Sequence, residues 1–236
     1  MNIAVILAGG NGKRTEQDIP KQFMNVYEKP IIIYTLEAFQ RHPDIDAILV
    51  VCLEGWQEIL WAYSREYEIT KLKWVIKGGD NGQESISMGI EALKDVCNEH
   101  DIVIIHDGIR PMVSLDVISD CIVKCRLHGS GLSAVRCQET IIKTENGICG
   151  DVGIARKEIM RVQSPQAYNY SKIKWAYKEA EKRGITDSVY ANMLLLELGE
   201  NLFFSQGSEK NVKITTMEDV EIFKALIRVE KEDWVK

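Results

Sequence analysis

The chain opens with Ile3-Ala4-Val5-Ile6-Leu7, continues with Ala8-Gly9-Gly10-Asn11-Gly12-Lys13-Arg14, and soon reaches Pro20-Lys21-Gln22. The apolar run is typical of a buried strand, and the glycines after it allow the backbone to come close to a ligand. Three cations, Lys13, Arg14 and Lys21, lie near that loop in sequence. Bare N–H groups and clustered positive charge favour a polyphosphate site. A glycine turn with solvated surface charge is the alternative.

Two common phosphate-binding motifs do not match this loop. Gly10-Asn11-Gly12 begins a G-x-G pattern, but Thr15 stands where the dinucleotide fingerprint requires its third glycine. The P-loop needs Ser or Thr directly after Gly-Lys, and here Arg14 follows Lys13. A nicotinamide enzyme and a P-loop ATPase are therefore both disfavoured.

Length and composition narrow the class of protein. The chain has 236 residues, of which 45% are hydrophobic and 27% charged, with a formal net charge of −6. These values suit a soluble α/β protein and disfavour a large nucleic-acid-binding surface. No apolar run approaches the roughly 20 residues of a membrane span, and the first residues do not resemble a signal peptide. Six cysteines without a C-x-x-C pair and four scattered histidines indicate a reducing, cytoplasmic setting without a zinc site.

Strand and helix patterns alternate along the chain. Apolar strand-like runs occur at residues 47–53, 73–76 and 102–106, and amphipathic helical patterns lie between them, one of them beginning at Pro30. This alternation predicts a single domain, residues 1–236, with a mainly parallel twisted sheet and helices on both faces. Ligands bind such sheets beyond the carboxyl ends of the strands, where the opening loop and His106-Asp107 would both lie.

A hairpin interrupts this alternation. Residues 140–143 resemble a strand, Glu145-Asn146-Gly147 is a turn signal, and a second short extended piece follows. We therefore expect residues 136–158 to form a β-hairpin arm that leaves the main sheet.

Three further segments carry candidate site residues. In His106-Asp107-Gly108-Ile109-Arg110-Pro111, Asp107 could hold Mg²⁺ or a sugar hydroxyl and Arg110 a phosphate, or the two could form an ion pair that closes a loop. Ser85, after Gly78-Gly79-Asp80, could bind a base edge or cap a helix. Lys213, in a strand expected at residues 211–215, could point into a cleft or outward.

Together these segments resemble one family. The order L-A-G-G-x-G-x-R, P-K-Q, G-G-D with a following Ser, H-D-x-x-R-P, P-Q, T-D and N-x-K-x-T is similar to that of the 2-C-methyl-D-erythritol 4-phosphate cytidylyltransferases, a family that includes ribitol-5-phosphate cytidylyltransferases. The resemblance extends from Ile3 to the last helix. It implies a nucleotidyltransferase fold, use of CTP with Mg²⁺, and a homodimer paired through the hairpin arm.

The resemblance also implies roles for individual residues. The cytosine would be surrounded by Ala8, Gly9, Gly79, Asp80 and Ser85, and the triphosphate would be held by Gly10, Gly12, Lys13, Arg14 and Lys21. Asp107 would lie near the ribose and the metal. Lys213 would act at the reacting phosphate together with Arg14 and Lys21 as the catalytic cations. The polyol phosphate would face Arg110, Thr140, Arg156 and Ser164, with Arg156 belonging either to its own site or to the neighbour's.

The acceptor follows less directly from these motifs. Methylerythritol phosphate is the acceptor predicted first, and it would place the enzyme in isoprenoid precursor synthesis. Ribitol phosphate, used in wall or capsule polymers, is the alternative. The runs Gly153-Ile154-Ala155-Arg156 and Gln163-Ser164-Pro165-Gln166 are closer to the ribitol branch, and Gly82 replaces a common arginine. A homologue that binds nucleotide without turnover is the alternative of another class.

Overall fold

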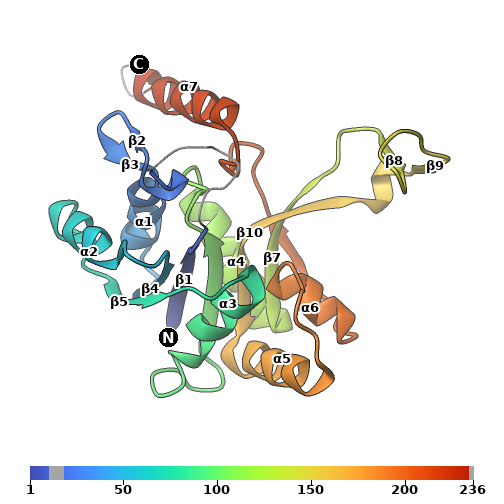
Figure 1. The fold of residues 1–236 in the computed structure, drawn as a ribbon, viewed down its shortest axis with the longest axis horizontal. Helices are drawn as coiled ribbons and strands as arrows, with labels where there is room; N and C mark the ends of the chain where they lie inside the picture. The colour runs from blue at the N-terminus through green and yellow to red at the C-terminus, as the bar shows by residue number, and fades with distance from the viewer. Residues whose placement is uncertain (11–18, 234–236) are drawn as a thin grey trace.

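The computed structural model describes residues 1–10 and 19–233, with side chains up to residue 230. Its centre is a seven-stranded sheet in the order β11-β7-β10-β6-β1-β4-β5 (Figure 1). The strands are β1 (Asn2–Ala8), β4 (Ala47–Cys52), β5 (Leu72–Lys77), β6 (Ile102–Asp107), β7 (Ser130–Arg136), β10 (Met160–Asn169) and β11 (Phe204–Gln206). Only β10 runs antiparallel to its neighbours, so the expected mainly parallel sheet is confirmed.

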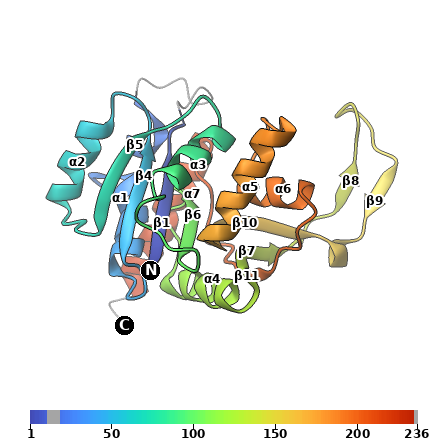
Figure 2. The ribbon, with the colours of Figure 1, turned by 90° about the horizontal axis from the view of Figure 1, so that it is seen from below.

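Helices cover both faces of this sheet, as Figure 2 shows. One face packs against α1 (Ile31–Arg41), α2 (Gln57–Glu66) and α4 (Leu115–His128), and the other against α3 (Gly82–Glu91), α5 (Tyr170–Arg183) and α6 (Ala191–Glu197). Side chains alternate across β1: Ala4 and Ile6 enter the first apolar cluster, and Ile3 and Val5 the second. This two-sided burial explains why the strands read as continuous apolar runs.

The last helix, α7 (Met217–Asp233), packs over α1 in a third apolar cluster that contains Ile31 and Phe223. The expected capping box begins it, because the Thr216 N–H donates to the Asp219 carboxylate (2.8 Å) and the Asp219 N–H to the Thr216 hydroxyl (3.4 Å). Short elements complete the chain: β2 (Asn25–Val26), β3 (Lys29–Pro30), and the 3₁₀ turns η1 (Lys21–Phe23) and η2 (Arg156–Glu158). Within the described residues, no helix combines the length and apolarity that crossing a membrane requires.

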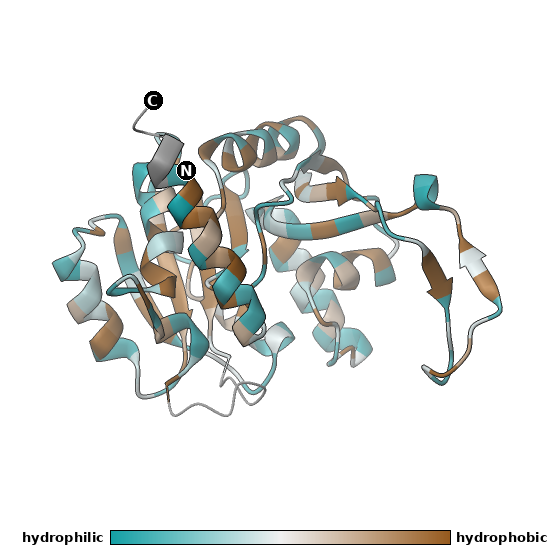
Figure 3. Ribbon diagram, turned by 90° about the horizontal axis from the view of Figure 1, so that it is seen from above, coloured by the Kyte–Doolittle hydropathy of each residue, from teal (hydrophilic) through white to brown (hydrophobic). Residues whose placement is uncertain are grey.

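The hairpin arm extends from the far ends of β7 and β10. Its strands β8 (Ile141–Lys143) and β9 (Val152–Ile154) pair antiparallel, which confirms the predicted hairpin. Figure 1 shows the arm projecting well away from the central sheet. Its apolar side chains Ile142, Ile148 and Val152 are at least half exposed, and Figure 3 shows hydrophobic colour on the arm far from the core.

Candidate active site

A cavity of about 800 Å³ opens where β1, β4, β5 and β6 end. The register of the parallel strands brings these ends to one edge of the sheet: Leu7 is level with Asp107, Ala8 with Cys52, and Cys52 with Lys77. The walls come from residues 7–10, 52–54, 77–83 and 186–190, with further side chains from Lys21, Gln22, Ser85, Ile86, Asp107, Ile109, Lys213 and Thr215. The motifs separated in the sequence thus meet in one cavity.

The loop after β1 is held by a side chain from η1. Gln22 is buried, and its Nε2 donates to the carbonyl oxygens of Ala8 (2.8 Å) and Gly10 (2.9 Å). Lys21, also buried, donates from Nζ to the Thr215 carbonyl (2.8 Å) and so ties η1 to the chain entering α7. The conformation of the glycine backbone therefore depends on the Pro20-Lys21-Gln22 motif.

The second glycine segment is shaped by the start of α3. Asn81 caps this helix by accepting from the Glu84 N–H (2.9 Å), so the alternative role of Ser85 as the cap is wrong. The Ser85 hydroxyl instead accepts from the Gly79 N–H (3.1 Å). A Cβ on Gly79 would lie 2.4 Å from Cγ of Glu84, so this position requires glycine. Gly78 and Gly79 therefore present backbone without side chains at the cavity wall.

Asp107 lies at the carboxyl end of β6 between two cations. Nε of Arg110 is 2.9 Å from one carboxylate oxygen, and Nζ of Lys213 is 3.2 Å from the other. Burial by itself would raise the pKa of Asp107, but Lys213 and Arg110 outweigh that effect and hold the pKa below its ordinary value. Asp107 is therefore ionised at neutral pH, and the two cations are fixed beside it.

A buried shell supports this ion-pair cluster. Ser164 is 1% exposed, and its hydroxyl accepts from the Asp107 N–H (3.0 Å). Asn211 is fully buried. Its side-chain Nδ2 donates to the Ser164 backbone carbonyl (2.7 Å), and its backbone carbonyl accepts from Nη1 of Arg110 (2.8 Å). His106 donates from Nε2 to the Arg110 carbonyl (3.2 Å), since a carbonyl can only accept. Burial lowers the pKa of His106 to about 4, so the ring is neutral.

Lys213 approaches Asp107 from a segment that is not a strand. The expected strand at residues 211–215 is wrong, because the Ile214 N–H donates to the Ile109 carbonyl (2.9 Å) in an isolated contact instead of a ladder. Nζ of Lys213 is also 3.4 Å from the Tyr190 hydroxyl and 5.2 Å from the centre of its ring. Of the two orientations considered for Lys213, the structure has the one that faces the cleft.

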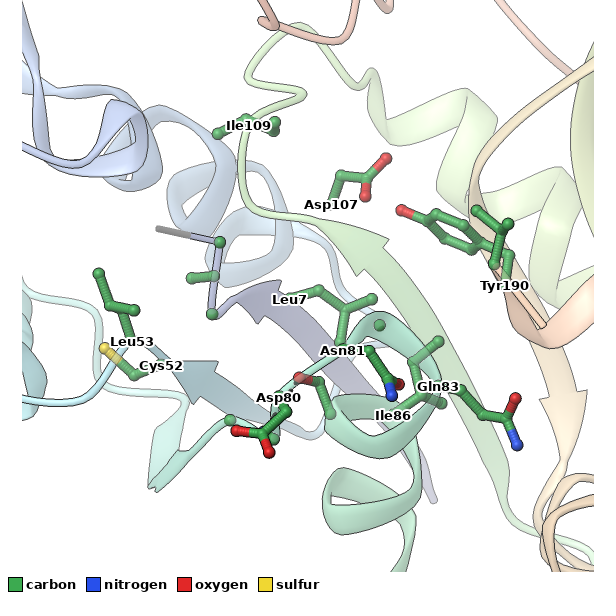
Figure 4. A pocket seen from close by; sticks show the side chains of 18 of the residues that line it. Leu7, Cys52, Leu53, Asp80, Asn81, Gln83, Ile86, Asp107, Ile109 and Tyr190 are labelled. Atoms are coloured by element: carbon green, nitrogen blue, oxygen red, sulfur yellow. Dashed lines mark hydrogen bonds between the residues drawn. The ribbon is translucent and has the colours of Figure 1, made fainter. Parts of the chain in front are cut away.

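The Tyr190 segment reaches the cavity because Gln83 anchors it to α3. Oε1 of Gln83 accepts from the Ser188 N–H (2.8 Å), and its Nε2 donates to the Ile185 carbonyl (2.6 Å). Figure 4 shows the Tyr190 phenol directed toward the side of the pocket where Asp107 lies. Sequence reasoning missed Tyr190, because only its contact with Lys213, 23 residues away, sets it apart.

A smaller pocket of about 160 Å³ adjoins the main cavity. Asp107, Val189, Tyr190 and Lys213 line both spaces, and Arg110 lines only the smaller one. Its remaining wall is formed by Val162, Gln163, Gln166, Asn192 and Met193. The ion-pair cluster therefore lies at the junction between a large and a small pocket.

The predicted site residues are only partly brought together. Ala8, Gly9, Gly10, Lys21, Gly79, Asp80, Ser85, Asp107 and Lys213 line the main cavity, and Arg110 lines the small pocket. Ser164 lies behind Asp107 instead of facing either pocket. Thr140 and Arg156 are exposed on the arm, where Nη1 of Arg156 donates to the Gln138 carbonyl (3.1 Å). Gly12, Lys13 and Arg14 lie outside the described residues.

The fold agrees with that of solved enzymes. A 4-diphosphocytidyl-2C-methyl-D-erythritol synthase from Anaerococcus prevotii superposes with a TM-score of 0.82 at 22% identity, covering 96% of each chain. A 2-C-methyl-D-erythritol 4-phosphate cytidylyltransferase from Francisella tularensis gives a TM-score of 0.75 at 29% identity, covering 94% of this chain and 97% of that one. At 22% identity, the similarity to the Anaerococcus enzyme shows a shared fold alone.

Sequence relatives and the family model are more specific. A ribitol-5-phosphate cytidylyltransferase from Lacticaseibacillus paracasei is 49% identical over 98% of this chain and its own full length. A 2-C-methyl-D-erythritol 4-phosphate cytidylyltransferase from Clostridium acetobutylicum is 36% identical over 97% of this chain and 98% of its own. The model of the family described as IspD, 2-C-methyl-D-erythritol 4-phosphate cytidylyltransferase, matches residues 2–229. The chain belongs to the IspD family and is a CTP-dependent cytidylyltransferase.

Proposed function

We propose that the enzyme transfers the cytidylyl group of CTP to ribitol 5-phosphate. The observation that carries the chemistry is the ion-pair cluster of Asp107, Arg110 and Lys213 at the junction of the two pockets. The acceptor is supported by the 49% identity with a full-length relative of that name, whereas the methylerythritol phosphate enzyme from Clostridium acetobutylicum is 36% identical. Methylerythritol phosphate, the first reading of the sequence, thus becomes the second candidate.

The reaction needs positive charge more than it needs a base. An oxygen of the acceptor phosphate attacks the α-phosphorus of CTP, the new P–O bond forms, and the bond to the β-phosphate oxygen breaks as pyrophosphate leaves. A phosphate monoester is already anionic near pH 7, so the barrier lies in bringing two anions together and in stabilising the phosphoryl oxygens. Lys213 is placed to serve both anions because it lines both pockets.

The other predicted site residues are assigned either to the nucleotide or to the acceptor. We assign Ala8, Gly9, Gly79, Asp80 and Ser85 to the cytosine, because they form the backbone ledges of the main cavity. Lys21 and Gly10, with Gly12, Lys13 and Arg14 from outside the described residues, are assigned to the triphosphate. Arg110 is assigned to the acceptor phosphate. Ser164 is a positioning residue in this proposal, since its hydroxyl contacts Asp107.

Mg²⁺ fits this site as an ion that binds together with the nucleotide phosphates. Among the described residues no three His, Cys, Asp or Glu side chains form a metal-binding group, and the carboxylate that lines both pockets is that of Asp107. One carboxylate together with substrate phosphates is a common way of binding Mg²⁺. When bound with CTP, the ion would neutralise charge on the phosphate oxygens, with Asp107 as its protein ligand.

An acceptor panel tests the proposal. We expect pyrophosphate release from CTP with ribitol 5-phosphate at a kcat/KM at least about tenfold above that with 2-C-methyl-D-erythritol 4-phosphate. The reverse order would make the second candidate the function. CTP binding without pyrophosphate release on any member of the panel would favour the non-catalytic homologue. Replacing CTP by UTP, GTP or ATP serves as the nucleotide control.

We also propose that two copies pair through the hairpin arm, residues 136–158, and that Arg156 acts in the partner's site. Support comes from the exposed apolar side chains on the arm and from the absence of Arg156 and Thr140 from both pockets of their own chain. Each C2 dimer would then have two composite sites.

Mixing two impaired variants tests this arrangement. We expect Arg156→Ala to raise the KM for the acceptor more than that for CTP, and Lys213→Met to be nearly inactive. If the arms cross, a randomised 1:1 mixture at limiting acceptor regains roughly a quarter of the wild-type rate, because each mixed dimer has one intact site. A mixture no more active than the mean of its parents would place Arg156 in its own subunit's site.

A further inference from the structure

We propose that Asn192 and Tyr190 select the acceptor by donating hydrogen bonds to hydroxyl groups of its polyol chain in the small pocket. This inference rests on the proposed function, since it concerns the acceptor of the same reaction. It adds two residues that none of the sequence motifs contains, and it assigns the 160 Å³ pocket to the hydroxyl-bearing carbons.

Buried hydrogen bonds orient Asn192. The Tyr168 hydroxyl donates to Oε1 of Gln166 (2.8 Å), so the other end of the Gln166 amide must be the donor. Nε2 of Gln166 donates to the Gln163 carbonyl (3.1 Å) and to Oδ1 of Asn192 (3.5 Å). All four side chains are at least nine-tenths buried. The oxygen of the Asn192 amide is thereby occupied from the protein side.

The remaining half of the Asn192 amide is a donor at the small pocket. Among the described residues no contact engages its Nδ2, although the side chain is only 8% exposed and lines this pocket. A substrate hydroxyl in this pocket can accept a hydrogen bond from this N–H. Gln163 is held by Ser208 at both ends of its amide: its Nε2 donates to the Ser208 carbonyl (2.9 Å), and its Oε1 accepts from the Ser208 N–H (3.2 Å).

Tyr190 provides a second donor at the same pocket. Nζ of Lys213 donates to the phenol oxygen (3.4 Å), which leaves the phenol proton available to a ligand. Tyr190 also lines the main cavity, so its hydroxyl lies at the boundary between nucleotide and acceptor. The small pocket therefore presents two neutral donors, the Asp107 carboxylate as acceptor, and the cations Arg110 and Lys213.

This set of groups matches a phosphorylated polyol. The cations suit the phosphate, and the neutral donors and the carboxylate suit hydroxyl groups, each of which can both donate and accept. Val162, Val189 and Met193 complete the wall. An acceptor that lacks the hydroxyls leaves both donors unpaired, so discrimination against it is expected to be large.

The experiment compares Asn192→Leu and Tyr190→Phe with wild type on two acceptors, ribitol 5-phosphate and the shorter glycerol 3-phosphate. We expect each variant to lose about tenfold or more in kcat/KM for ribitol 5-phosphate, to lose less than about threefold for glycerol 3-phosphate, and to keep its KM for CTP. The controls Asn201→Leu and Tyr63→Phe, of the same chemistry outside both pockets, should match wild type on both acceptors.

Equal losses on both acceptors would overturn the inference, because a merely structural role does not depend on the number of hydroxyls. If Asn192→Leu does not fold, Asn192→Asp keeps the shape and replaces the donor by an acceptor, with the same selective loss expected. If wild type uses methylerythritol phosphate instead of ribitol 5-phosphate, the proposed function fails, and the same comparison with that acceptor decides the inference. Wild type inactive on every acceptor would overturn both.

Discussion

Replacing Lys213 with methionine is expected to lower pyrophosphate release by about 10²–10³-fold, with the folded structure retained. Removing one preorganised donor from a phosphoryl or acyl transition state typically has an effect of this size. Lys213 lies 3.2 Å from Asp107 and lines both pockets, so its loss leaves that carboxylate facing the substrate phosphates with less compensation. Both kcat/KM values, for CTP and for the acceptor, should fall.

The matched control is Lys210→Met. Lys210 is exposed, lies on the same segment three residues earlier, and lines neither pocket. Its loss changes the net charge by the same amount, so any general electrostatic effect appears in both variants. Turnover of Lys213→Met close to that of the control would remove Lys213 from the chemistry.

Replacing Asp107 with asparagine is expected to lower kcat/KM by about 10²-fold and to destabilise the fold by about 3 kcal/mol. The substitution preserves size but leaves Arg110 and Lys213 beside a neutral amide. Arg110 is mostly buried, with a side chain 13% exposed, so its unpaired charge is costly. The two cations would also be free to move from the positions that they hold beside Asp107.

Stability and catalysis can be separated for this variant. Urea unfolding measures the first effect, and initial rates at a temperature where circular dichroism shows full folding measure the second. Asp95→Asn, an exposed carboxylate outside both pockets, is the control for charge removal. Wild-type rates in folded Asp107→Asn would contradict both its role beside the reacting phosphates and its assignment as the Mg²⁺ ligand.

Most of the fold could be predicted from local patterns in the sequence. Continuous apolar strands alternate with amphipathic helices because both faces of a parallel sheet are covered, and β1 shows this directly by sending alternate side chains into two apolar clusters. The reversed direction of β10 was not accessible, since strand direction depends on pairing with β6 and β7 across the sheet. The absence of a strand around Lys213 has the same origin: alternation alone does not supply a neighbouring ladder.

Some residues of the candidate site could likewise be predicted from the sequence, and others could not. Glycine loops, Asp107, Arg110 and Lys213 could be recognised because residue type and order along the chain carry their signal. The helix cap at Asn81, the position of Ser164 behind Asp107, and Tyr190 beside Lys213 could not, because each depends on which of several chemically suitable partners is nearest in space.

The amino-acid sequence alone was enough to predict a glycine-rich loop after the first strand, an α/β sheet and the motifs of a cytidylyltransferase. Those features are local, since they depend on the residue types and their spacing. Which side chains face the two pockets depends on the tertiary structure. Strand register brings Asp107 level with Leu7, and the crossing of distant segments places Lys213 against Asp107 and Tyr190. Those contacts join residues as many as 106 positions apart, so no local pattern could specify them.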